Sequence, residues 1–188
     1  MRALQKLAAA IALAGITSAA AAAGSLVVSP AATQAQTGDL VVVDIRGAGF
    51  TDNVVGGGFD LSFNAAVLSL SSVVIDNVEW DFLTHPGTIN NAAGTLSGVW
   101  FNAFAAPLPT GDFAIARLSF TAVAEGFSAL NLAANVSFPF VNDAAELIAV
   151  SFGSGGVAVT AVPELATWEA MPLGLAALLW LRRRLHVA

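Results

Sequence analysis

The chain has 188 residues, of which 56% are hydrophobic and 11% charged, with a formal net charge of −6. Between residues 24 and 161, eleven acidic residues face only two basic ones, Arg46 and Arg117, so the formal net charge of this region is −9. Such a surface repels phosphate backbones and argues against nucleic-acid binding. The absence of cysteine excludes disulfides, thiolate metal sites and a cysteine nucleophile.

Residues 1–23 have the composition of a secretory signal peptide. Two basic residues open the chain, an apolar stretch follows over 7–16, and small residues then offer a cleavage site near Ala23. The alternative is a retained membrane anchor, but the apolar stretch is shorter than the roughly 20 residues of a spanning helix. We therefore expect an exported protein.

From residue 24 to 161 the apolar residues recur with the period of two that is typical of β-strands. Two clear cases are "GFDLSFN" (58–64) and "NVEWDF" (77–82), where Val78, Trp80 and Phe82 would share one face. Further short runs lie at 39–47, 113–122, 129–140, 147–152 and 155–162. Because Gly, Pro and Asn-Asp clusters separate these runs, the region is predicted to be an all-β antiparallel sandwich. A short helical turn is expected after Asn64.

Several of these segments resemble the cohesin-like family. The resemblance is carried by "TGDLVVVDIRG", "FDLSFNAAVLSL", "GDFAIARLSFTAVAEGFSAL" and "GGVAVT", although Asn64 stands where the family often has Asp and Ala65 where Pro is common. The resemblance implies a cohesin-like jelly roll over residues 24–161. The family includes dockerin-binding modules of cellulosomes and many exported domains without a known partner, so dockerin binding is not carried over.

Catalytic and metal-binding patterns are scarce in this region. His85, placed before Pro86-Gly87 in an expected loop, is the only base available there for a nucleophilic triad, and no G-x-S-x-G elbow is present. A zinc site would need several His or Cys ligands. The loop segments 51–53 and 141–143 carry carboxylates beside amides, which leaves a structural Ca²⁺ open beside ordinary turns. We predict a protein without catalysis and without a cofactor.

Two tryptophans bear on sugar binding, because carbohydrate platforms present exposed aromatic rings. Trp80 and Trp100 are the tryptophans of this region, and a core position is the simpler expectation for each. If Trp100 is exposed beside Phe101 and Phe104, the segment "VWFNAF" becomes the candidate contact surface for a ligand.

The C-terminal residues 162–188 resemble the PEP-CTERM sorting signal. The signal has a short motif, an apolar helix and a basic cluster in this order, and here the helix would be 170–181. The matching residues are Val162, Pro163, Glu164, Thr167 and Trp168 of the motif, with Leu165 for the second proline, and Arg182, Arg183 and Arg184 of the basic stop. The resemblance implies recognition and cleavage by an exosortase-like membrane enzyme.

The physical properties of the tail agree with transient contact with the membrane. Positive residues stay on the cytoplasmic side, so the three arginines would hold the tail while the body lies outside. A helix over 170–181 would span only about 18 Å, short of a core of about 30 Å. A permanent anchor that is slightly short remains the alternative.

Together these features predict a non-catalytic exported protein of the cell envelope or extracellular matrix. Its β-sandwich would be structural or adhesive, with an extracellular polysaccharide or another envelope protein as partner. The alternative function is a carbohydrate-binding module.

Overall fold

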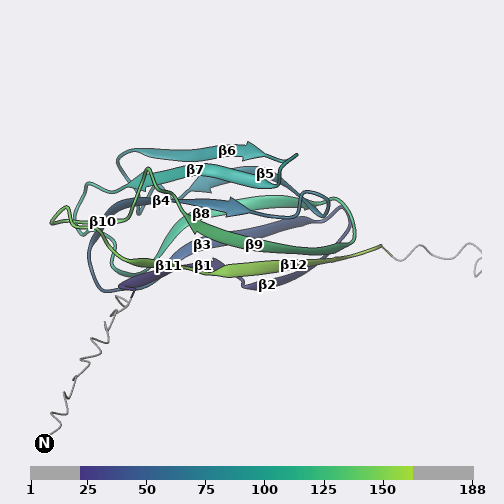
Figure 1. Ribbon diagram of the computed structural model, residues 1–188, viewed down its shortest axis with the longest axis horizontal. Helices are drawn as coiled ribbons and strands as arrows, with labels where there is room; N and C mark the ends of the chain where they lie inside the picture. The colour runs from purple at the N-terminus through teal and green to yellow at the C-terminus, as the bar shows by residue number, and fades with distance from the viewer. Residues whose placement is uncertain (1–21, 163–188) are drawn as a thin grey trace, which may run out of the picture.

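The computed structural model describes residues 22–162, and its twelve named elements in this range are all β-strands. They form two sheets of a sandwich, with most strands running along the long axis of the body (Figure 1). Within these residues no helix is long and apolar enough to cross a membrane. The predicted all-β sandwich is confirmed, while the predicted signal peptide (1–23) lies outside the described residues except for Ala22 and Ala23, and the predicted C-terminal apolar helix (170–181) lies outside them entirely.

One sheet has five strands in the order β11-β1-β3-β8-β5. Its central strand β3 alternates as predicted, with Val41, Val43 and Ile45 buried and Val42 exposed, because successive side chains of a strand point to opposite faces. The strands of this sheet are β1 (Gly24–Ser29), β3 (Leu40–Phe50), β5 (Leu68–Ile75), β8 (Gly111–Ala122) and β11 (Val150–Phe152).

The other sheet has seven strands in the order β2-β12-β9-β4-β7-β6, with the short β10 paired to β4. In Figure 1, β6 lies at one edge of the body and β2 at the other. The strands of this sheet are β2 (Ala32–Gln36), β4 (Val54–Ser62), β6 (Thr84–Asn90), β7 (Thr95–Asn102), β9 (Gly126–Ala134), β10 (Val141–Asn142) and β12 (Ser154–Thr160).

The prediction of a purely antiparallel sandwich is wrong at one margin of the molecule. There β1 pairs with β11 and β2 pairs with β12, both in parallel. The reason is that the first and last segments of the sandwich run side by side and change sheets together, the first after Ser29 and the last at Gly153. The amide of Gly153 donates to the carbonyl of Leu26 (2.8 Å) at this crossing.

Trp80 joins the two sheets through the core. Its ring lies 4.3 Å from that of Phe101 in β7 and 5.5 Å from that of Phe113 in β8. Its indole N–H donates to the carbonyl of Ala114 (2.9 Å), so the polar edge of the buried ring is satisfied. The core position expected for Trp80 is therefore confirmed.

The strand predicted for "NVEWDF" is wrong, because residues 76–83 form a turn between β5 and β6. The carboxylate of Asp76 accepts the N–H groups of Val78 (2.9 Å) and Glu79 (3.4 Å), which closes the turn. Val78 is 85% exposed and Phe82 59% exposed, whereas Trp80 alone points inward. The apolar alternation in this segment is therefore a coincidence of composition.

The turn expected after Asn64 is present. The Asn64 carbonyl accepts from the amides of Val67 (3.0 Å) and Leu68 (2.9 Å), and its side-chain Oδ1 accepts from the amide of Ala66 (3.1 Å). Asn64 can accept this hydrogen bond just as the Asp that is frequent at this position in the cohesin-like family would, because both side chains have an Oδ1 acceptor.

Candidate functional site

Trp100 lies on the outer face of the seven-stranded sheet. Its neighbours Val99 and Phe101 have no exposed surface, so alternation along β7 directs the indole outward. In register, Trp100 is flanked by Gly58 of β4 and by His85 of β6. The expectation that Trp100 belongs to the core is wrong; its side chain is half-buried on the surface.

Two further rings flank this indole and form a row with it. Phe138, from the loop after β9, lies 5.3 Å from Trp100 with 21° between the ring planes, and His85 lies 6.1 Å away with 10°. We call His85, Trp100 and Phe138 the aromatic row.

The row depends on Gly58, because a Cβ there would meet the Val99 carbonyl oxygen at 2.5 Å and the Phe138 Cβ at 2.8 Å. Gly58 and the other glycines of the triplet at 56–58 lie inside β4, and Gly58 permits close approach of the loop that bears Phe138.

The strands of the seven-stranded sheet carry almost no charge. Asp60 and His85 are their only ionisable side chains. Asp60 accepts from the amide of Gly98 (2.7 Å) and from the Asn135 side-chain amide (3.0 Å), so its carboxylate is already engaged. The face around the row therefore suits a partner that makes apolar contacts and neutral hydrogen bonds.

The predicted contact segment 99–104 divides between the core and the surface. Phe101 has no exposed area, so its proposed role in ligand contact is wrong, because this end of β7 turns Val99 and Phe101 inward. Phe104 lies beyond the end of β7 and is 80% exposed, with its ring 5.6 Å from that of Phe82. Trp100 and Phe104 thus remain as surface aromatics, Trp100 within β7 and Phe104 in the loop after it.

A carboxylate fixes the loop that bears Phe104. Asp81 accepts the amides of Phe104 (2.8 Å) and Ala105 (3.2 Å). These backbone hydrogen bonds, that of Phe104 foremost, lower the pKa of Asp81 below its ordinary value. The exposed pair Phe82–Phe104 is therefore held on an anchored loop.

His85 lies in β6 and not in the expected loop, and it has no triad around it. Its Nδ1 accepts from the amide of Gly87 (3.0 Å), and no serine or carboxylate in residues 22–162 hydrogen bonds to it. Its place beside Trp100 gives it a role in the aromatic row.

The two loops considered for Ca²⁺ do meet in the structure. The Asn53 side-chain amide donates to the Asp143 carboxylate (3.0 Å). Because Asn53 donates its side-chain N–H in this contact, its amide oxygen is not turned toward the Asp143 carboxylate. Throughout the described part of the chain, no group of three or more His, Cys, Asp or Glu side chains could hold a metal.

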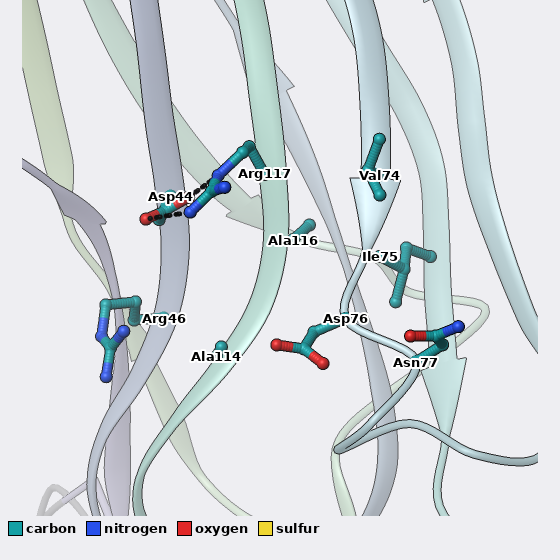
Figure 2. A pocket seen from close by; sticks show the side chains of 9 residues that line it. All are labelled: Asp44, Arg46, Val74, Ile75, Asp76, Asn77, Ala114, Ala116 and Arg117. Atoms are coloured by element: carbon teal, nitrogen blue, oxygen red, sulfur yellow. Dashed lines mark hydrogen bonds and ion pairs between the residues drawn. The ribbon is translucent and has the colours of Figure 1, made fainter.

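The five-stranded sheet has a charged hollow on its outer face that the sequence did not predict (Figure 2). The Arg117 guanidinium donates to the Asp44 carboxylate across the sheet, at 2.8 Å from Nε and 3.4 Å from the second nitrogen. Arg46 and Asp76 also line the hollow. The only available signal was that Arg46 and Arg117 are the two basic residues of 24–161; their proximity depends on strand register.

The sorting-signal residues cannot be placed in the same way. Val162 is the last described residue and is 52% exposed. Pro163, Glu164, Thr167, Trp168 and the three arginines Arg182, Arg183 and Arg184 lie outside the described residues.

Solved structures with a similar fold are cohesin modules, whereas no protein-family model and no curated protein matches the chain. A cohesin from Clostridium acetobutylicum is 20% identical, with a TM-score of 0.56 over 74% of this chain and 92% of its own. A cohesin in a type I cohesin–dockerin complex from Clostridium thermocellum is 13% identical (TM-score 0.61, 76% and 96%). A non-cellulosomal cohesin from Archaeoglobus fulgidus is 14% identical (TM-score 0.58, 74% and 92%). These similarities establish a cohesin-like fold.

Proposed function

We propose that the chain is a non-catalytic recognition module of an exported protein, and that it binds a partner on the face around the aromatic row. The observation that carries this proposal is the half-buried Trp100, held between Phe138 and His85 on a face nearly free of charge. Large aromatic side chains dominate the binding energy of such surfaces because they bury much apolar area at a small entropic cost.

The preferred partner is another protein of the envelope or extracellular matrix, so that the module is structural or adhesive. The fold supports this choice, since the similar cohesin from Clostridium thermocellum is part of a complex with a dockerin. The partner of this chain is left as a protein of unspecified fold, because identities below 25% do not carry a binding specificity over.

The second part of the proposal is that the C-terminal segment 162–188 serves as a sorting signal. An exosortase-like enzyme would recognise Val162 to Glu164 and remove the tail after export, with the apolar helix and arginines in transient contact with the membrane. The intact mass of the native protein from the producing cell tests this step. A mass that includes residues 170–188 would contradict processing and favour a permanent anchor.

Protein binding is tested by cross-linking on producing cells, with the full-length chain as bait and mass spectrometry of what is retained. We expect one dominant partner with the wild type, lost with Trp100→Ala. Val42→Ala is the control, since Val42 is 41% exposed on the other sheet, so its replacement should not affect retention of the partner. Equal retention of the partner by Trp100→Ala would contradict the proposed surface.

Carbohydrate binding is the second candidate, because a half-buried indole on the outer face of a sheet also suits the apolar face of a sugar ring. Affinity electrophoresis through gels that contain neutral polysaccharides separates the two. Retardation that Trp100→Ala abolishes would establish the carbohydrate function, and unchanged mobility in every gel would eliminate it. A hydrolytic activity that His85→Ala abolishes would contradict the non-catalytic proposal itself.

A further inference from the structure

The charged hollow lies on the sheet opposite the aromatic row and has a volume of about 440 Å³, within the size range of ligand pockets. It spans three neighbouring strands: Asp44 and Arg46 come from β3, Arg117 from β8, and Asp76 from the end of β5. The floor of the hollow is formed by the small side chains of Ala114 and Ala116. These residues flank an irregularity in the pairing of β8 with β3, where Arg46 is opposite Ala114 and Ile45 opposite Ala116.

Both arginines of residues 24–161 line this one hollow, in a region whose formal net charge is −9. Asp44 and Asp76 line the same hollow, so its formal charge is zero and the acidic side chains there are balanced. Because residues 24–161 hold no other lysine or arginine, this hollow is the place on the described surface where an anionic group could pair with a guanidinium.

The two arginines do not have the same role. Arg117 is bound by Asp44 in a two-pronged contact, and this hydrogen bond and the charge of Asp44 raise the pKa of Arg117. Arg46 is half-buried, and its guanidinium makes no hydrogen bond or ion pair within residues 22–162. Its fork of donors is therefore free to bind a planar carboxylate.

The opposite wall of the hollow offers hydrogen-bond acceptors. Figure 2 shows the Asp76 carboxylate turned toward Ala114, with Asn77 beside it and Arg46 on the far side of Ala114. The strand of Arg46, β3, and the strand that Asp76 follows, β5, lie two positions apart in the sheet, about 10 Å at the usual strand spacing. A small anion would contact only one wall, whereas a ring with a carboxylate at one end and hydroxyls at the other would contact both.

We propose that this hollow binds a uronate residue of an acidic polysaccharide. The sugar carboxylate pairs with Arg46, its hydroxyls donate to Asp76 and Asn77, and its ring covers the alanine floor. A simple carboxylate is disfavoured because it has no hydroxyl to donate to Asp76. This site is independent of the aromatic row and of the proposed protein partner.

The probe is an oligogalacturonate, measured by titration calorimetry with the protein as it is recovered after export. Its methyl ester is the matched ligand, since it keeps the ring and hydroxyls and loses the charge. We expect binding of the acid and at least a tenfold weaker affinity for the ester, because the charge-assisted bidentate contact is lost. Equal affinity for acid and ester would overturn the proposal, as would the absence of binding at millimolar probe.

Three variants locate the site. Arg46→Gln should weaken binding of the acid about tenfold or more, and Arg46→Lys should have an intermediate affinity because it keeps the charge without the fork. Ala114→Leu fills the floor and should also abolish binding, so a failure of one variant to fold leaves the other as a test. Unchanged binding by folded Arg46→Gln would overturn the proposal.

Trp100→Ala distinguishes this site from the proposed function, because it should leave uronate binding intact while abolishing capture of the protein partner. Raising the salt concentration should weaken uronate binding only slightly, since screening also relieves repulsion by the acidic body. A steep loss with salt would indicate non-specific ionic binding and overturn the assignment. Arg46-dependent binding of an acidic peptide in place of the uronate would overturn the ligand class.

Discussion

The outer faces of the two sheets differ sharply, although both cover the same apolar core. The face of the seven-stranded sheet carries three rings in a row and one engaged carboxylate, Asp60. The face of the five-stranded sheet carries both arginines, a paired carboxylate in Asp44 and a second one in Asp76. The comparison teaches that the inward residues define the fold, whereas each outer face can be built for a different chemistry.

The largest effect should come from Trp80, which lies in the core between the two sheets. Trp80→Ala removes a side chain that is 1% exposed and contacts Phe101 in one sheet and Phe113 in the other. We expect a loss of about 3–5 kcal/mol in the free energy of unfolding, because a large cavity remains. Denaturant titration measures it.

Val78→Ala is the control from the same turn, and it should change the free energy of unfolding by no more than about 0.5 kcal/mol since Val78 is 85% exposed. Similar losses for the two variants would mean that Val78 and Trp80 share a buried face after all, as the alternation in the sequence had indicated.

An intermediate effect is expected from Gly58→Ala, which addresses the aromatic face alone. The added Cβ would meet the Val99 carbonyl and Phe138, so the free energy of unfolding should fall by about 1–3 kcal/mol. The variant should also lose the protein partner while it keeps uronate binding. Ser62→Ala, at the exposed end of the same strand, serves as the control. Loss of both binding activities would show that the two faces are coupled.

The smallest effect concerns the connection between the sheets, where Asp81 precedes β6 and holds the loop after β7. Because its pKa is lowered in the folded state, the carboxylate stabilises the fold above the ordinary titration range of Asp, near pH 4. This contribution is lost as the pH falls through the lowered value. Thermal melts should therefore show Asp81→Asn less stable than wild type at pH 6, with the difference shrinking toward pH 3. A difference that stays constant over this range would mean that the charge of Asp81 contributes nothing.

Much of the fold could be predicted because it is encoded in local patterns. The alternation in 58–64 and 39–47 identifies β4 and β3, and Asn64 marks its turn. The strand predicted for 77–82 was wrong because the Asp76 carboxylate accepts two backbone N–H groups and closes a turn. The spacing of apolar residues gives no information about such hydrogen bonds. The parallel pairs at β1 and β2 were missed for another reason, since they join the two ends of the sandwich.

The candidate site was predictable only in part. Trp100 and Phe104 were singled out as aromatics, but Phe101 lies between them in the core, and exposure along β7 depends on which face meets the opposite sheet. Phe138 and His85 had no visible connection to Trp100, because they come from 38 residues after it and 15 before it.

Local residue order thus suffices for most strands and turns and for the acidic balance of residues 24–161, because these depend on side-chain period, backbone preference and composition. Strand pairing decides the rest. The pairing of β4 with β7 sets Gly58 beside Trp100 and leaves room for Phe138 to stack on the indole. The pairing of β3 and β5 with β8 places Arg46, Arg117 and Asp76 around two alanines. Those contacts form only when distant segments adopt one register, and a shift by one residue along β3, β7 or β8 would turn Arg46, Trp100 or Arg117 to the other face.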